Sequence, residues 1–569
     1  MATQNKQEKR RATLQALAIG GLVTLGGCGT IWRRGEPTSK IDPASFPPLD
    51  RIKPLLRPTL TSTPATNFPA LDAHAHFFNA SDVNVKDYIW KCFGHEQSEV
   101  SQDFLYTLAI AADFLASFVP TAAEEFDELI KWLDGGPAPG EDYDLMAQRI
   151  YDASLRSGFK SEYDKQQTRY LQELSAMHGS SRIKQQPPGL NVDQVRNLLD
   201  VERREQLHVR VFGVPQTMGS RKDPGGFIEF LGRMMSRRST NIQTYASYYT
   251  ERPGAFGIQG VFGSLVDFDQ WLDNYPYSSR QDQMLLHSLL SAMSGGYMIP
   301  LISFNPWAPN PSASYDLMVR AIESFGFAGV KIYPPVGYYP YGNASLLTNP
   351  GRYAGNLKDL DATLKKTYDW AARRGVPVMA HAGESMGIDD TADSYGGPKG
   401  YAKLLDAYAN SPERMAPTIL AGHFGGAGVN QGEQWPDAFT GFLKWPNGVG
   451  RNFYSDVAYW DELLRCASSP KACQEARDRV AHAINGNGSE NHLLYGSDWH
   501  MMSKVGGWNR YPFRVREQLC TGDMPIKTEA LFHSNTMRCF GFKQSSLQYT
   551  CITSRLAATP GGVPGWLRI

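Results

Sequence analysis

The feature of this chain that most restricts its fold is a regular alternation of apolar runs with amphipathic stretches after about residue 255. The apolar runs have the length of β-strands, and the stretches between them repeat apolar residues at helical spacing. We predict strands at 70–78, 259–267, 297–304, 327–333, 376–381, 418–423, 452–457 and 492–497. We predict the intervening helices at 283–293, 314–325, 361–374, 401–408 and 475–484.

Strands that alternate with helices favour a parallel sheet with right-handed crossovers. Eight such units predict an α/β fold of the (β/α)8 TIM-barrel type over residues 69–545. Residues 80–255 follow the first strand and carry helical patterns, such as 104–118 and 122–133, so we expect a large helical insertion there. Whether 209–214 adds a strand to the sheet stays open. The Pro/Gly-rich tail, 546–569, is expected to lie along the surface.

Polar side chains stand at or near the carboxyl ends of five of these strands, where a barrel of this type carries its catalytic groups. His74 and His76 are two residues apart on one strand and should share a face. Four more residues of this kind follow along the chain: Lys331, His381, His423 and Asp498. Imidazole and carboxylate groups together can bind one or two divalent metals, and Zn is the best fit.

The N-terminus has the pattern of an export signal. Basic residues at 6–11 precede a mildly apolar stretch, 12–27, that is shorter than the roughly 20 residues of a membrane-spanning helix. It ends at Leu25-Gly-Gly-Cys28, which resembles a bacterial lipoprotein box, and Arg10-Arg11 resembles a twin-arginine signal. The resemblance implies a signal peptide at 1–27, a lipid on Cys28, a tether at 28–68 and attachment to the periplasmic face of a membrane in the bacterial cell envelope.

The charge balance limits which classes of partner the chain can bind, and the cysteine content limits its covalent cross-links. Lys+Arg and Asp+Glu both number 57, so no basic surface for nucleic acid is expected. An exported chain can form disulfides, and Cys466 and Cys473 are the best local pair. The cysteines lack zinc-finger spacing. The oligomeric state cannot be read from the sequence, and the expected partner is a small-molecule substrate.

Five motifs in order resemble the amidohydrolase superfamily, and most of all its "amidohydrolase 2" branch. The resemblance covers 70–78 and about 255–545, and 535–540 is similar to the closing segment of the family. The motifs are Asp72-Ala-His-Ala-His76, Gly329-Val-Lys-Ile-Tyr333, Met379-Ala-His-Ala-Gly383, Leu420-Ala-Gly-His423 and Tyr495-Gly-Ser-Asp498. The insertion at 80–255 has no counterpart in the family pattern.

The resemblance implies a role for each strand-end residue. His74, His76 and Asp498 would bind one metal. His381 would join that metal in single-metal members of the family, or bind the second metal in two-metal members. His423 would bind a second metal or contact water and substrate. Lys331 matches the lysine that is carboxylated and bridges two metals, but it can instead remain an ammonium group that binds a substrate carboxylate. The number of metals therefore stays open.

The resemblance also implies a metal-dependent hydrolase. A divalent metal lowers the pKa of water to about 7 and polarises a carbonyl group. Asp498 would take up the proton, with His423 and Lys331 as further catalytic residues, and the substrate would be an amide, lactone or ester, cyclic or aromatic. One alternative is a decarboxylase of a ring acid at the same site. Another is a non-catalytic lipoprotein that only binds a ligand.

Several other residues can serve either the site or only the fold. The Tyr- and Pro-rich run 333–341 can form an aromatic wall over the barrel mouth or a simple packing loop. Glu384 and His500 can orient other site groups or have no role in the site. The remaining histidines are expected to be structural, and no Gly-x-Ser-x-Gly motif supports a serine hydrolase.

Overall fold

A computed structural model shows that the predicted barrel is formed. The structure describes residues 35–56, 67–94, 119–140, 232–250, 256–269, 275–347, 355–383, 392–412, 414–426 and 435–568, together with positions 113, 116, 117, 230, 271, 272 and 385. The predicted signal peptide lies outside them, as do 28–34 and 57–66 of the predicted tether and the strand considered at 209–214.

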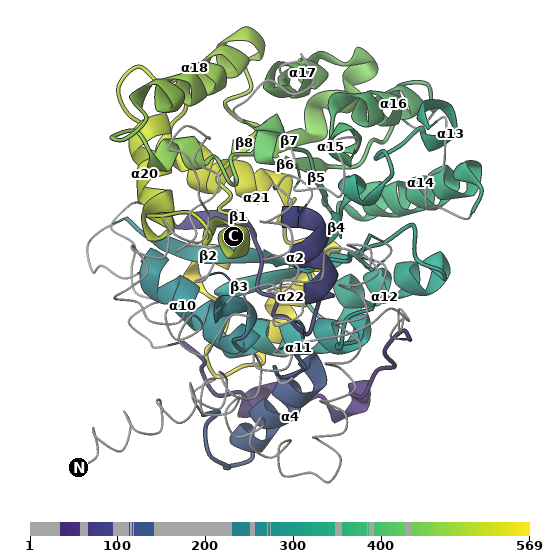
Figure 1. Ribbon diagram of the computed structural model, residues 1–569, viewed down its shortest axis with the longest axis vertical. Coiled ribbons are helices and arrows are strands. Elements are labelled where there is room, and N and C mark those ends of the chain that lie inside the picture. Colours follow the sequence, from purple (N-terminus) through teal and green to yellow (C-terminus); the bar gives the residue numbers. More distant parts are fainter. Residues whose placement is uncertain are drawn as a thin grey trace, which may run out of the picture. The chain divides into compact units, whose positions relative to one another are not determined.

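Eight strands form one sheet in sequence order, and each pairs with the next in parallel (Figure 1). Their bounds are β1 Ala70–Ala75, β2 Ile258–Ser264, β3 Met298–Ser303, β4 Gly329–Ile332, β5 Val378–His381, β6 Ile419–Gly422, β7 Phe453–Asp456 and β8 Leu493–Leu494. All eight are buried along their whole length apart from Gln259. Strands covered on both faces are typical of a parallel barrel, and the predicted fold class is confirmed.

Backbone hydrogen bonds join the last strand to the first. The Ala73 N–H donates to the Tyr495 carbonyl over 2.9 Å. The His74 carbonyl accepts from the N–H groups of Ser497 and Asp498, at 3.0 and 2.7 Å. These bonds close the barrel at the point where two of the predicted ligand motifs lie side by side.

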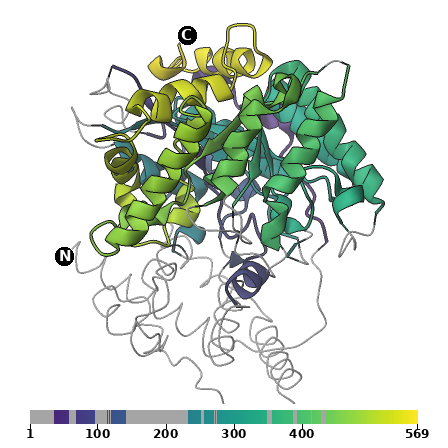
Figure 2. The ribbon, with the colours of Figure 1, turned by 90° about the horizontal axis from the view of Figure 1, so that it is seen from above.

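Helices follow most strands and cover the outside of the barrel (Figures 1 and 2). The long ones are α10 Arg238–Thr250, α11 Arg280–Met293, α12 Pro311–Ser324, α14 Leu357–Arg374, α16 Pro398–Ala409, α18 Pro470–Asn487, α20 Tyr511–Leu519 and α22 Leu547–Ala557. The shorter ones are α13 Asn343–Leu346, α15 Ala392–Tyr395, α17 Trp435–Gly441, α19 Trp499–Met502 and α21 Asn535–Cys539. None of the described helices is both long and apolar enough to cross a membrane.

The chain divides into two compact units. The barrel unit comprises 39–78, 238–271 and 279–569, and the second unit includes 79–237 and 272–278. In the second unit, α2 spans Val85–Gly94 and α4 spans Ala122–Leu133, where Thr121 and Glu124 form a capping box that stabilises the first turn of α4. The predicted insertion, 80–255, therefore extends too far: α10 lies in the barrel unit.

The C-terminal segment differs from the prediction. It does not simply lie along the surface but forms α22 and ends with the buried residues Trp566 and Leu567. These two pack in one cluster with inner barrel residues such as Phe262, whose ring stacks on Phe540 with 3.8 Å between centroids. Sequence composition missed this because two apolar side chains among glycines and prolines give no periodic signal.

Cys466 and Cys473 form the predicted local disulfide. The bond joins the turn before α18 to the first turn of that helix. Among the described residues the free cysteines are Cys520, Cys539 and Cys551.

Trp566 offers a test of the C-terminal segment. We expect Trp566→Ala to lower the free energy of unfolding by about 3–5 kcal/mol, because it removes a large buried side chain. The exposed Arg568→Ala is the matched control and should change stability by less than about 0.5 kcal/mol. Urea unfolding followed by tryptophan fluorescence and circular dichroism measures both. Equal stability of the two variants would contradict the structural role of Trp566.

Candidate metal centre

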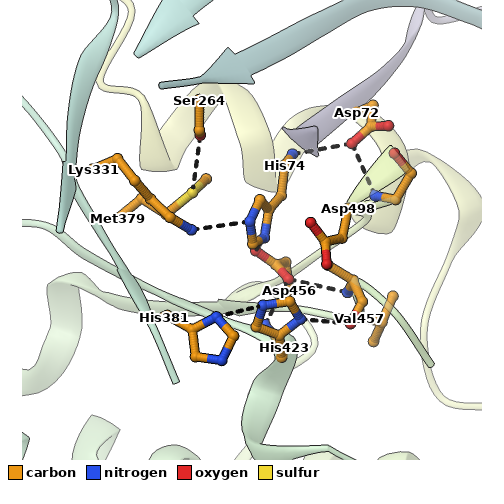
Figure 3. Close-up of polar contacts among 12 residues, drawn as sticks. Asp72, His74, Ser264, Lys331, Met379, His381, His423, Asp456, Val457 and Asp498 are labelled. Atoms are coloured by element: carbon orange, nitrogen blue, oxygen red, sulfur yellow. Dashed lines mark hydrogen bonds and ion pairs between the residues drawn. The ribbon is translucent and has the colours of Figure 1, made fainter. Parts of the chain in front are cut away.

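The structure brings all six predicted site residues together at the carboxyl ends of the strands, and Figure 3 labels all of them except His76. His74 and His76 come from β1 and the residue after it, Lys331 from β4 and His381 from the end of β5. His423 follows β6 directly, and Asp498 follows β8. Each side chain is at most 8 % exposed, so the site is nearly closed to bulk water.

His76, His74 and Asp498 form the tightest group of candidate ligands. One ligand atom of each lies within 4.8 Å of the others, and all three residues are buried. His76 Nε2 is 3.3 Å from Asp498 Oδ1, while its Nδ1 is 2.8 Å from the Ser264 carbonyl oxygen. Because a carbonyl oxygen can only accept, Nδ1 of His76 carries a proton and Nε2 faces the carboxylate.

His74 is held from two sides. Its Nδ1 donates to Asp456 Oδ2 over 3.1 Å, and its Nε2 lies 3.0 Å from Lys331 Nζ. The neighbouring backbone leaves no room for larger residues: a Cβ at Gly422 or Gly496 would lie 2.9 or 2.8 Å from the His74 side chain. The orientation of the His74 ring is therefore fixed by both packing and hydrogen bonding.

His423 and His381 form the second half of the site. His423 Nδ1 donates to the Ala458 carbonyl oxygen over 3.0 Å, and its Nε2 lies 3.0 Å from His381 Nδ1. The ring centroids of the two histidines are 4.3 Å apart, and the His423 ring is 5.0 Å from that of His74. The two halves of the site are thus in contact through imidazole rings.

Asp456, at the end of β7, is a site residue that the sequence did not reveal. Besides His74, it accepts hydrogen bonds from the backbone N–H groups of His423 and Ala458, at 2.8 and 3.0 Å. One carboxylate therefore orients residues from β1 and β6. The available signal was its place at the end of a predicted strand, in Tyr454-Ser-Asp456.

Two of the candidate ligands have unusual backbone conformations. His423 has φ of 73° and Asp498 has φ of 50°, and Phe424 also has φ of 49°. Residues other than glycine seldom adopt positive φ, and such strain is concentrated at functional sites because the surroundings must hold it in place. Here it turns each side chain into the site directly after its strand ends.

Burial and neighbouring charges set the protonation of the site. Burial lowers the pKa of His74 well below its usual value, and lowers that of His423 as well. Burial also lowers the pKa of Lys331 to about 8, against the opposing effect of Asp498 and Asp456. Burial raises the pKa of Asp498, but the His76 hydrogen bond and nearby imidazoles outweigh it and bring the value to about 2. At neutral pH the site therefore holds neutral His74 and His423 rings and an ionised Asp498.

Only one residue of the predicted aromatic wall lies at the site. The Tyr333 ring is 4.6 Å from that of His381, and Phe268 packs edge-on against Tyr333 at 4.7 Å. Tyr338, by contrast, is buried and contacts Trp307, with the phenol oxygen accepting from the Tyr333 N–H. The 333–341 run thus combines both alternatives, a site-facing ring and a packing loop.

Two of the other histidines pack against neighbours in the fold. The His500 ring stacks on Phe78 with centroids 4.3 Å apart. Glu384 lies outside the described residues. His287 bonds the Gln283 carbonyl within α11, as expected of a structural histidine.

Comparison with known proteins gives one family match. Residues 297–542 match the family model described as Amidohydrolase. The match spans β3 to β8 and includes four of the six predicted site residues. No curated protein matches the chain.

Two solved structures are similar over 50 % of this chain. One is an uncharacterized TIM-barrel protein from Bordetella bronchiseptica, with 14 % identity, 78 % of its own length covered and a TM-score of 0.32. The other is an amidohydrolase from Burkholderia multivorans with bound HEPES, with 11 % identity, 84 % of its length covered and a TM-score of 0.29. Residues 297–542 are therefore similar to the amidohydrolase family, and the motifs at the strand ends agree with that match.

Proposed function

We propose that this protein is a metal-dependent hydrolase of a C–N or C–O bond, with Zn as the best-fitting metal. The observation that carries the proposal is the state of three imidazole rings. The Nδ1 atoms of His74, His76 and His423 each contact an oxygen acceptor, over 3.1, 2.8 and 3.0 Å. Each ring therefore directs an Nε2 lone pair into the site, as metal-binding histidines do when outer groups fix their tautomer.

The pair of His76 and Asp498 fits a cation directly. Both nitrogens of His76 face an oxygen acceptor, since Ser264 contributes a carbonyl and Asp498 a carboxylate. Either a proton or a metal ion must lie between Nε2 and the carboxylate. His74 completes a buried set of two imidazoles and one carboxylate, which is a ligand set that suits Zn and related metals.

His381, His423 and Lys331 form the second part of the proposed centre. We propose that His381 and His423 bind a second ion, with Lys331 between the two positions. Lys331 Nζ lies 3.0 Å from His74 Nε2, and His423 lies between His74 and His381. An ammonium group beside two cations would be repelled, so this assignment requires Lys331 to be neutral or carboxylated. Burial lowers the pKa of Lys331 to about 8, so the neutral amine is much easier to reach than for an ordinary lysine.

The bound metal would supply Lewis-acid activation of water and of the scissile carbonyl. The protein's own groups do the rest. Asp498 is ionised at neutral pH and can accept a proton from the attacking water and deliver it to the leaving group. Asp456 keeps His74 and His423 in position. The near-complete burial of the site limits water to the reacting molecule and strengthens each electrostatic contact.

The Tyr333 ring supports the proposal of a cyclic or aromatic substrate. It is only partly buried, lies against His381 and is backed by Phe268. A flat ring packed on this tyrosine would stand beside the reacting group.

We also propose that the protein is an exported lipoprotein anchored through Cys28. The support is the basic N-terminal run followed by an apolar stretch that ends at Leu25-Gly-Gly-Cys28. A lipid at this position followed by a tether would keep the barrel at the membrane surface.

Metal content tests the function. The purified wild type should contain at least one divalent ion per chain, and His76→Ala should lose it because the tightest ligand group is broken. His482→Ala, which removes an exposed histidine on α18, should keep the metal. Elemental mass spectrometry measures the metal content per chain. A wild type without metal even after reconstitution would contradict the metal centre.

A panel of amides, lactones and esters in ¹⁸O-labelled water tests the reaction. Incorporation of ¹⁸O into the product supports hydrolysis, and CO2 release without ¹⁸O incorporation would contradict hydrolysis.

Lys331→Ala tests the second ion. We expect it to lower the metal content by about one ion per chain, because a bridging group between two cations is lost. Lys504→Ala removes another buried lysine, which packs over Tyr459 and is not one of the proposed ligands, and should leave the content unchanged. Unchanged content in Lys331→Ala, with loss of substrate binding, would instead make Lys331 a substrate-binding residue.

Cell fractionation tests the anchor. In a bacterial host the wild type should be found in the membrane fraction, and Cys28→Ala should move to the aqueous fraction because the lipid attachment point is lost. Cys551→Ala is the control for removal of a thiol. Membrane association that survives Cys28→Ala would contradict the lipoprotein proposal.

A further inference from the structure

Asp72, the first residue of the Asp72-Ala-His-Ala-His76 motif, is a fully buried carboxylate that faces away from the proposed metal ligands. Its Oδ1 accepts from the N–H of His74 and from the N–H of Ser497, both over 3.0 Å. Its Oδ2 accepts from the Tyr245 hydroxyl over 2.6 Å. One side chain thus joins β1, the end of β8 and α10.

The two hydrogen bonds to Asp72 Oδ1 come from β1 and from the segment after β8, which carry the three ligands of the first proposed ion. His74 is itself a proposed ligand, and Ser497 directly precedes Asp498. The same junction is closed by the His74 carbonyl, which accepts from Ser497 and Asp498. The pairing register of β1 with β2 also shifts between Asp72 and Ala75. This local irregularity lets Asp72 turn towards α10 while His74 turns into the site.

Tyr245 is well suited to hold this junction in place. It is fully buried, and burial raises the pKa of its hydroxyl well above the usual value, so the hydroxyl remains a donor. Its ring packs edge-on against Phe77 and Trp499, with centroids 5.4 and 5.6 Å away. Phe77 directly follows His76, and Trp499 directly follows Asp498.

We propose that Tyr245 is a positioning residue for the metal centre, acting on all three ligands of the first ion. It holds His74 through Asp72, His76 through Phe77, and Asp498 through both Asp72 and Trp499. The proposal rests on the proposed function. It assigns a role to a residue of the β1–β2 connection, in the stretch that has no counterpart in the family pattern.

The expected effect follows from the hydrogen bond. Phenylalanine at 245 keeps the ring contacts but leaves Oδ2 of Asp72 without its tyrosine partner in a buried place, which carries a penalty for a carboxylate. The carboxylate then shifts, and the N–H groups of His74 and Ser497 lose their fixed acceptor. Loss of such an outer partner typically weakens metal binding by about 10- to 100-fold.

The chain offers a matched control in Tyr297. It is also fully buried, and its ring lies 6.3 Å from that of Tyr245. Its hydroxyl contacts the Thr250 hydroxyl over 2.7 Å and makes no bond to Asp72. Tyr297→Phe therefore removes a buried phenol from the same cluster without touching the β1–β8 junction.

The experiment measures Zn²⁺ affinity of the full chain, stripped of metal, by competition with a chromogenic chelator. We expect Tyr245→Phe to bind Zn²⁺ about 10- to 100-fold more weakly than the wild type, and Tyr297→Phe to bind as the wild type does. Asp72→Asn and the double variant Asp72→Asn/Tyr245→Phe complete a cycle. The losses should be far from additive, because both substitutions break the same contact. Circular dichroism and thermal unfolding of the metal-free chains report on the fold.

The outcomes separate this inference from the proposed function. Wild-type affinity in Tyr245→Phe, or equal losses in Tyr245→Phe and Tyr297→Phe, would overturn the positioning role and leave the metal centre intact. A wild type that does not bind Zn²⁺ would overturn both. If Tyr245→Phe does not fold, Asp72→Asn decides the matter: wild-type affinity in that variant overturns the inference, and a loss supports it.

Discussion

The structure depends on one junction, where the first strand of the barrel meets the last. The His74 carbonyl accepts two backbone N–H groups from beyond β8, and Asp72 accepts one N–H from each side. This junction closes the barrel and at the same time brings His74, His76 and Asp498 within reach of one another. The same contacts therefore close the barrel and bring the proposed ligands together.

Electrostatics at this junction follow from burial. Charged groups are costly to bury unless they are paired. In this site the imidazole rings of His74 and His423 are neutral, and the carboxylates accept hydrogen bonds, which lowers that cost. Asp456 is the clearest case, because it receives two backbone N–H groups and one imidazole. The buried group of His74, His76 and Asp498 could hold a cation, whose positive charge would balance the ionised Asp498.

Much of this could be predicted from the sequence because the relevant signals are local. Strand periodicity placed the eight strands, and a polar residue at the end of an apolar run marked His74, His381 and Asp498 as site residues. Asp456 escaped because a single acidic residue at a strand end is a weak signal. Tyr245 and Trp566 escaped for a different reason: their partners, Asp72 and Phe262, lie far away in the sequence, and no local pattern reports a contact of that range.

The hydrogen bond between Asp72 and Ser497 joins residues that are 425 positions apart. Contacts between residues so far apart in the sequence form late in folding, because closing a long loop costs conformational entropy before the contact can stabilise the chain. During synthesis, the first two proposed ligands emerge long before the third. The three can therefore meet only after the chain has been made through Asp498, and a fragment released earlier would carry an incomplete set of proposed ligands.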